Sequence, residues 1–507
     1  MARMAACMAL ALGACASTGA RADWTLLQTE HFSLYTQRDD DAVRMNLRQL
    51  EVFRWMALKL MGADERSVRA QARFDIYVLN GRLRRLFPGL GEDTRGIYAS
   101  CSDGAAAYGT HGNEINRLED WDLIVLQHEY AHHLMFQYAT MSYPAWYVEG
   151  FAEYISTSVF AEGSISLGRR SFARTSELAP WQSGGYEEVL RWQSSKGNSN
   201  NDISTFYAPS WLLVHYMLSD DERAKKLNDY FVRIGAGEDP VAAFELATGI
   251  AVVDLPKRLK RHLREMAVLR LKGDDMPRPV IRAFDLGQDA ADYVLATAQL
   301  TCTDRDRAQP VLAKLRALAP DPARASPGLR LTLASAEARF GDPVSAIALL
   351  DAIVAADAGS AEAHYLLGRA WTRRAEKLSG HEEAAAREQA RANLFKAYRL
   401  RKDHAPTLYH LARALSPDGP SPNAVNAARA ARLLAPAVPD YAVLEAQLDL
   451  QLGDRERAIR ALGPLASNPH DPGAATRVRQ AIGAIRAGRS VAEVESLMKP
   501  QPKTPAR

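Results

Sequence analysis

The residues best suited to chemistry lie in one largely apolar stretch, Leu123 to Ala139, which reads LIVLQHEYAHHLMFQYA. It contains His128 and His132, whose spacing along the sequence corresponds to one helical turn, and Glu129 follows the first of them. A polar group taken out of water without partners carries a large free-energy penalty, and an unpaired charge carries a larger one. Histidines at this spacing share one face of a helix and converge on one point, where two imidazoles can bind a metal ion. The stretch therefore predicts a two-histidine metal clamp.

A third metal ligand is expected on the next predicted helix, which contains AWYVEGFAEYI. Zinc in catalytic sites takes three protein ligands and keeps one position open. The segment from His132 to Glu149 is long enough to finish one helix, turn at Pro144 and present a carboxylate from a second helix. Glu153, one turn further on, is expected to orient a ligating histidine by accepting its other ring proton. Glu129 is then placed to act as the general base that removes a proton from water.

The elements that must position these side chains read as an α+β domain over residues 23–271. Alternating apolar and polar residues indicate half-buried strands, and longer patterns with the period of a helix indicate helices. We expect strands over 31–37 and 72–80 with a helix over 42–61 between them, a hairpin around Asp103-Gly104, and helices over 119–138 and 145–158. Strands first and helices second favour segregated layers over an alternating β-α-β arrangement.

The motif HEYAHH followed by WYVEGFAEY resembles the gluzincin zinc metallopeptidases, which include thermolysin-like enzymes and relatives of aminopeptidase N. The resemblance implies a thermolysin/aminopeptidase-like domain in which His128, His132 and Glu149 bind one Zn²⁺ per chain. It also implies that Glu129 is the catalytic base. An extended substrate would pair its backbone with a sheet edge, expected at AAAYGT, residues 105–110.

Members of that family stabilise the oxyanion with a tyrosine or histidine further along the chain. Tyr207, in FYAPSW, follows Glu149 at a distance along the chain similar to that of the aminopeptidase branch. A phenol near the zinc can donate to the developing oxyanion. The alternative is that Tyr207 packs against or caps a helix, and Tyr143, Tyr147 and His215 are rivals for the role. The chain has no Gly-x-Met-Glu-Asn stretch, the amine-gripping motif of that branch, so exopeptidase activity does not follow.

A second region, residues 286–498, is rich in Ala, Leu and Arg and repeats itself. Four alanines, Ala346, Ala390, Ala424 and Ala458, recur in it, and the last two steps between them are equal in length. Both steps match the tetratricopeptide repeat, whose unit is about 34 residues long, and the longer first step implies an insertion. Such units stack into an all-α array with a concave surface for partners. The alternative is a generic Ala-rich helical bundle. Residues 272–285 are expected to form a linker, and residues 499–507 a disordered tail.

Residues 1–20 have the layout of a secretory signal, with a positive charge, an apolar run and then small residues. The ending Leu-Gly-Ala-Cys resembles a bacterial lipobox, which implies a lipid on Cys15. Ala16 after the cysteine resembles the pattern of lipoproteins sorted to the outer membrane and facing the periplasm. The alternatives are a cleavable signal ending near Ala20 and a soluble N-terminal helix.

Bulk composition limits the function classes. The chain has 507 residues, which indicates two or more domains. Its 63 basic and 60 acidic residues leave a net charge of +3, which argues against a dedicated nucleic-acid surface. Beyond the N-terminal segment, Cys101 and Cys302 lack metal-ligand spacing, and whether they pair is left open.

These features predict a zinc metallopeptidase anchored to the bacterial cell envelope, with helical repeats that recruit a substrate or a protein partner. A second hypothesis is a scaffold in which the repeats are the functional part and the peptidase fold is inactive. Glu129 argues against it, because an inactive domain has no need of the base. A third hypothesis is a zinc hydrolase of a non-peptide amide, and a free strand edge beside the site would instead favour an extended peptide.

Overall fold

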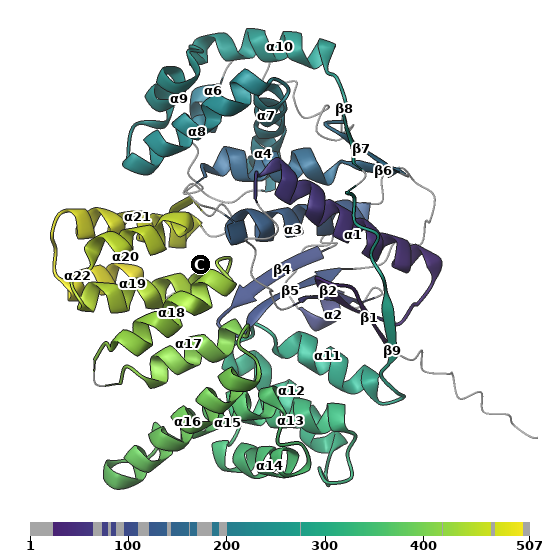
Figure 1. Cartoon of the computed structure of the whole chain (residues 1–507), viewed down its shortest axis with the longest axis vertical. Coiled ribbons are helices and arrows are strands. Elements are labelled where there is room, and N and C mark those ends of the chain that lie inside the picture. The colour runs from purple at the N-terminus through teal and green to yellow at the C-terminus, as the bar shows by residue number, and fades with distance from the viewer. Residues whose placement is uncertain are drawn as a thin grey trace, which may run out of the picture.

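The structure is a computed structural model that is mostly helical, with a small mixed sheet in its N-terminal part (Figure 1). It describes residues 24–63, 73–79, 83–87, 96–109, 121–138, 143–161, 163–169, 185–191, 200–273, 275–417, 419–467 and 472–499. The predicted signal segment with Cys15, and residues 500–507 of the predicted tail, lie outside the described residues.

A six-stranded mixed sheet forms the base of the N-terminal region, in the order β4-β5-β3-β2-β1-β9. Its strands are β1 (Thr25–Gln28), β2 (Phe32–Thr36), β3 (Phe74–Val78), β4 (Gly96–Cys101), β5 (Gly104–Gly109) and β9 (Arg282–Asp285). The pairs β2-β3 and β3-β5 are parallel, and the other neighbours are antiparallel. The hairpin predicted around Asp103-Gly104 is confirmed, and Gly104 there has a φ of +124°, which favours glycine.

Two expectations about this sheet are wrong. The helix α1 (Asp41–Leu60) connects the parallel neighbours β2 and β3, so the layers are not segregated here. Parallel neighbours need such a crossover. The predicted edge at residues 105–110 is interior over its described part, residues 105–109, because β5 pairs with β3 as well as with β4. Alternation identifies strands but not their neighbours, and among the described residues β4 is the outer strand on this side.

Helices cover both faces of the sheet. On one face, α1 and α3 (Trp121–Tyr138) share a core in which the ring of Tyr130 lies 4.9 Å from that of Phe32 and 5.4 Å from that of Phe74. On the other face, α11 (Ala290–Leu300) and the short α2 (Leu83–Leu86) pack near Tyr77 and Tyr108. The sheet therefore gives α3, which carries the two histidines, a rigid support.

In the rest of this region, α4 (Ala145–Ser156) lies between α3 and α7 (Asn200–Leu218), and the other helices pack against α7 and one another. The others are α6 (Tyr186–Leu190), α8 (Asp221–Ala236), α9 (Pro240–Thr248), η2 (Val252–Asp254) and α10 (Leu255–Glu265). A small sheet contains β6 (Val159–Ala161), β7 (Ser164–Leu167) and β8 (Leu269–Lys272). None of the described helices is both long and apolar enough to cross a membrane.

The close contact between α4 and α7 depends on Gly150. A Cβ atom built there would lie 2.4 Å from the backbone oxygen of Ser210 and 2.7 Å from Cγ2 of Val214. We expect Gly150→Ala to lower the free energy of unfolding by about 2 kcal/mol, because it overpacks this contact. Urea denaturation measures the change. Gly235→Ala, in α8 with open space around it, is the control and should be neutral or slightly stabilising. Equal stability of the two variants would contradict the prediction.

The linker predicted over residues 272–285 differs from the structure at both ends. Lys272 ends β8, which pairs with β7, and Arg282–Asp285 forms β9, which pairs with β1. The backbone groups on the outer side of β1 would otherwise be an open edge, and β9 satisfies them. The chain therefore returns to the N-terminal sheet before it enters the C-terminal helices.

The C-terminal region is an array of helix pairs, and in Figure 1 it curves from beneath the sheet to the side of the β4–β5 hairpin. After α11 it contains α12 (Arg305–Leu318), α13 (Pro327–Phe340), α14 (Pro343–Ala356), α15 (Ala361–Ala375), α16 (Gly380–Leu400), α17 (Ala405–Ala414), α18 (Pro422–Leu434), α19 (Pro439–Gln451), α20 (Arg455–Leu462), η3 (Gly463–Ser467), α21 (Pro472–Arg486) and α22 (Val491–Met498).

The predicted repeat positions are equivalent in the structure. Ala346, Ala390, Ala424 and Ala458 lie on the second helices of successive pairs, α14, α16, α18 and α20, and all four are buried. The longer first step has a local cause: α16 has 21 residues against 14 in α14, and its extra residues precede Ala390. The insertion therefore lengthens one helix and leaves the stacking of the pairs intact.

Candidate metal centre

Three side chains from two helices converge on one point. His128 and His132 lie one turn apart on α3, with their Nε2 atoms 2.9 Å from each other. Oε2 of Glu149, on α4, lies 3.3 Å from Nε2 of His128 and 3.4 Å from Nε2 of His132. The structure therefore brings together the three ligands that the sequence predicts.

The spacing of the three ligand atoms fits a tetrahedral metal ion. Zinc binds imidazole nitrogen and carboxylate oxygen at about 2.0–2.2 Å, which separates neighbouring ligand atoms of a tetrahedron by about 3.3 Å. The observed separations are 2.9, 3.3 and 3.4 Å. Two imidazoles and one carboxylate are also donors that zinc accepts readily. The residues present therefore fit a zinc ion.

Buried apolar side chains fix the rotation of both helices. On α3, Tyr130 and Leu134 are 4% and 1% exposed, which commits that part of the helix to the core. On α4, Trp146 and Phe151 are buried in the same core, and Nε1 of Trp146 donates to the hydroxyl of Tyr230 at 3.2 Å. Because the apolar sides of both helices are buried in the core, the side of α3 that carries the histidines faces the side of α4 that carries the glutamates.

The charges around this point favour a cation. Glu149 and Glu153 are 1% and 7% exposed, and Oε1 of Glu153 lies 3.3 Å from Nδ1 of His128. Burial by itself lowers the pKa of His128, but the hydrogen bond with Glu149 and the charge of Glu153 outweigh it and raise the pKa to about 9. Burial keeps the pKa of His132 below its ordinary value. A metal ion binds the neutral imidazole, so it would replace the proton that His128 otherwise holds.

Two further predicted residues flank the three ligands. Glu129 follows His128 on α3, and its side chain is partly exposed. Tyr207, on α7, is also partly exposed, and its ring centroid lies 6.0 Å from that of His128. Both residues are therefore partly open to solvent near His128: Tyr207 has the ring contact, and the charge of Glu129 helps to raise the pKa of His128.

The three rivals of Tyr207 contact other groups. The ring nitrogens of His215 lie 3.0 Å from a backbone oxygen and 2.8 Å from a second imidazole, which belongs to α10. The rings of Tyr143 and Tyr147 pack against Phe231, with centroid distances of 5.1 and 4.7 Å. Of these four candidates, Tyr207 is the one for which the structure gives a ring contact with His128.

His133 faces the sheet and not the metal point. Its Nδ1 atom lies 3.1 Å from the hydroxyl of Tyr98, and its ring lies 4.8 Å from the ring of Phe74. Burial, and then the charge of Arg54, lower its pKa to about 4, so the ring is neutral at pH 7. Adjacent positions on a helix point apart, and this histidine therefore contributes to packing.

Sequence reasoning misplaced the strand beside the site, because it assigned the sheet edge to residues 105–110. The strand that contacts α3 from the edge is β4, whose Tyr98 reaches His133. A Cβ atom built at Gly96 would lie 3.0 Å from Cγ1 of Val125, so the start of β4 passes very close to α3. A glycine in a strand signals such an approach, although it does not identify the partner.

The tetratricopeptide repeat family matches residues 327–370, which span α13, α14 and most of α15. This part of the helical array is therefore a tetratricopeptide-type repeat. No curated protein and no solved structure matches the chain.

Proposed function

We propose that the chain is a zinc-dependent metallopeptidase that hydrolyses peptide bonds at the bacterial cell envelope. One observation carries the proposal: His128, His132 and Glu149 converge from two helices, with Glu129 beside them. A buried group of two imidazoles and a carboxylate is costly unless an ion or hydrogen bonds compensate for it. A carboxylate next to such a centre and open to solvent is what water activation requires.

We assign the residues three roles: metal binding, orientation of a metal ligand, and proton transfer. His128, His132 and Glu149 would hold the zinc ion, and Glu153 would orient the ring of His128 through Nδ1. When bound, the zinc ion supplies Lewis-acid chemistry: it polarises a carbonyl group and makes water more acidic. Glu129 accepts a proton from the attacking water and passes it to the nitrogen of the leaving amine.

The position of β4 favours a peptide over a non-peptide amide. Among the described residues, no strand pairs with the outer edge of β4, and this strand runs beside α3. An extended peptide can add to such an edge through its backbone, which places its carbonyl groups along the strand. A compact amide would make no use of this edge.

The cysteines support a proposal for the compartment and the membrane anchor. The structure pairs Cys101 and Cys302 in a disulfide, which persists in oxidising compartments such as the periplasm. We propose a lipid on Cys15 that holds the chain on the outer membrane, and helical repeats that recruit a protein substrate or partner.

The test is digestion of a mixed peptide library by the soluble form that starts at Ala16, with products read by mass spectrometry. The same protein is assayed zinc-loaded, after chelation, and after zinc is restored. We expect cleavage that disappears on chelation and returns with zinc, and the product termini will show whether cuts are internal. No cleavage by the zinc-loaded protein would refute the peptidase and favour a scaffold or a non-peptide amide.

Tyr207 is expected to donate its phenolic hydrogen to the oxygen that becomes negatively charged. We expect Tyr207→Phe to lower kcat by about 10²-fold with KM nearly unchanged, the usual cost of one lost oxyanion donor. Steady-state kinetics on a peptide found in the library measures this. Tyr143→Phe, a phenol that packs against Phe231, is the matched control. Equal kinetics for the two variants would remove Tyr207 from the mechanism.

A further inference from the structure

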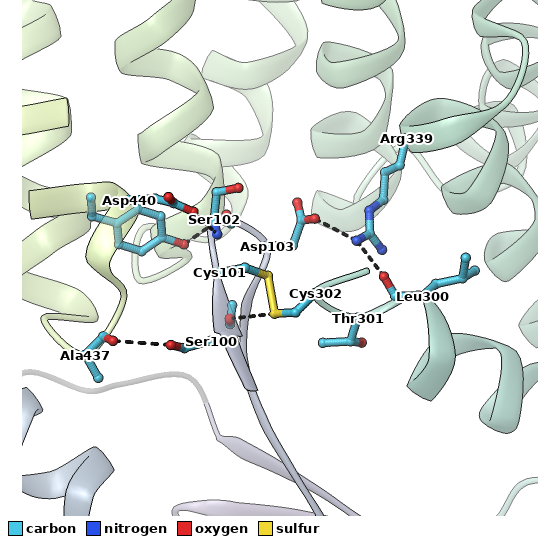
Figure 2. The surroundings of a disulfide bond; sticks show 12 residues. Ser100, Cys101, Ser102, Asp103, Leu300, Thr301, Cys302, Arg339, Ala437 and Asp440 are labelled. Atoms are coloured by element: carbon cyan, nitrogen blue, oxygen red, sulfur yellow. Dashed lines mark hydrogen bonds and ion pairs between the residues drawn. A yellow bond between two sulfur atoms is a disulfide. The ribbon is translucent and has the colours of Figure 1, made fainter. Parts of the chain in front are cut away.

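The turn of the β4–β5 hairpin, residues 101–104, reaches into the helical array. Figure 2 shows it surrounded by side chains from segments far apart in the sequence. Its contacts come from Cys302, just after α11, and from the first helices of the next four pairs, α13, α15, α17 and α19. The hairpin turn therefore occupies part of the inner face of the array, the face that tetratricopeptide-type arrays offer to partners. The partner proposed above would bind the repeats outside this part.

Asp103 lies at the tip of the hairpin turn, and side chains of the helical array bind its carboxylate. Nη2 of Arg339 lies 2.6 Å from Oδ2 of Asp103, and Arg369 pairs with Oδ1. The hydroxyl of Tyr365 donates to the same Oδ1 at 3.3 Å. The two guanidinium side chains are only 10% and 15% exposed, so both would lose their nearest carboxylate in a poorly solvated place without Asp103.

The electrostatics agree with this geometry. Burial by itself raises the pKa of Asp103, but Arg369 and Arg339 outweigh it and hold the pKa well below its ordinary value. The carboxylate is therefore ionised throughout the physiological range. A charged group of this kind, held by two arginines and a phenol, is a specific contact and not incidental packing.

The backbone of the hairpin turn is also bound. The N–H group of Ser102 donates to Oδ2 of Asp440 at 2.7 Å, and the hydroxyl of Tyr441 donates to the backbone oxygen of Ser102 at 3.1 Å. Asp440 and Tyr441, at the start of α19, thus satisfy both polar backbone groups of Ser102. The disulfide between Cys101 and Cys302 then ties the end of β4 covalently to the segment that follows α11 (Figure 2).

We propose that the inner face of the helical array is a binding site whose occupant is this chain's own hairpin turn, and that the contact positions β4 beside the candidate metal centre. Further along β4, the hydroxyl of Tyr98 lies within hydrogen-bond distance of His133, and Gly96 packs closely against Val125 of α3. Contacts at the tip of β4 therefore help to fix the part of the strand that lies beside α3. Asp103 is a positioning residue in this arrangement. The consequence for cleavage rests on the proposed function, whereas the binding of the turn does not.

The test is hydrogen exchange of the full-length zinc-loaded protein, read over residues 96–109. We expect Asp103→Asn to speed exchange there about tenfold or more, because it leaves two arginines without their buried partner. Tyr441→Phe, a milder change that keeps the ring, should speed it about threefold through the loss of one hydrogen bond. Asp321→Asn is the matched control, since Asp321 pairs with Arg324 on the surface, and exchange should not change.

Peptide kinetics separates the two parts of the proposal. For Asp103→Asn we expect a higher KM with unchanged zinc content, because the strand that receives substrate is less well fixed. Unchanged exchange in both the Asp103 and Tyr441 variants would overturn the binding of the turn. Faster exchange with unaltered KM would overturn the positioning role. If the wild-type protein cleaves no peptide, the proposed function fails, and the exchange data still decide whether the array binds the hairpin.

Discussion

Replacement of Glu129 by glutamine is expected to lower kcat for peptide hydrolysis by about 10³-fold while the protein keeps its zinc, since general-base catalysis contributes about 10²–10⁴-fold. The amide has nearly the shape of the carboxylate but cannot accept the proton of the attacking water. Glu129 is partly exposed and follows the proposed ligand His128 in the sequence, so the change should not disturb the core. Steady-state kinetics and zinc analysis on the same samples give the two numbers.

The control for this variant is Glu222→Gln, an exposed carboxylate on α8 that pairs with Lys225 and lies outside the proposed machinery. It should leave both kcat and zinc content unchanged. If Glu129→Gln retained full activity, another group would have to be the base. If it lost its zinc, Glu129 would be part of the metal site, and the division of roles proposed above would be wrong.

The candidate metal centre could be predicted because its parts are local. His128 and His132 are related by one helical turn, and Glu149 follows within one helix-turn-helix unit, so periodicity and spacing are enough to bring them together. The four repeat alanines were predictable for a similar reason, since stacked pairs impose a fixed period on the sequence.

Long-range pairing could not be predicted in this way. Asp103 meets Arg339 and Arg369, which are 236 and 266 residues away, and no local pattern encodes such a contact. The same limit explains why the sheet edge lies at β4 and not at the predicted residues 105–110, and why β9 forms where the sequence predicts a linker. Alternation in a strand reports which face is buried, but it does not report which strand lies next to it.

The second large effect that we expect is on stability, which should depend on zinc bound by the three proposed ligands. Zinc in excess, at about 100 times its dissociation constant, is expected to raise the free energy of unfolding of the wild-type protein by about 2.7 kcal/mol, because it binds the folded chain and not the unfolded one. His132→Gln should abolish this stabilisation and reduce the bound zinc from about one ion per chain to near zero, since two of three protein ligands do not retain the ion. Thermal unfolding with and without zinc, together with metal analysis after dialysis, measures both effects.

The sequence supplies a matched control in the next residue. His133 is an imidazole on the same helix, but its described contacts are with Tyr98 and Phe74 and not with the three proposed ligands. We therefore expect His133→Gln to keep its zinc even if packing suffers. Glu153→Gln should keep zinc with an affinity lowered about 10–100-fold, because it loses the carboxylate that orients His128 and leaves the ligands in place. The expected order of zinc affinity is wild type and His133→Gln, then Glu153→Gln, then His132→Gln. Zinc lost from His133→Gln but kept by His132→Gln would place the metal on the opposite side of α3, and the ligand geometry described above would then be wrong.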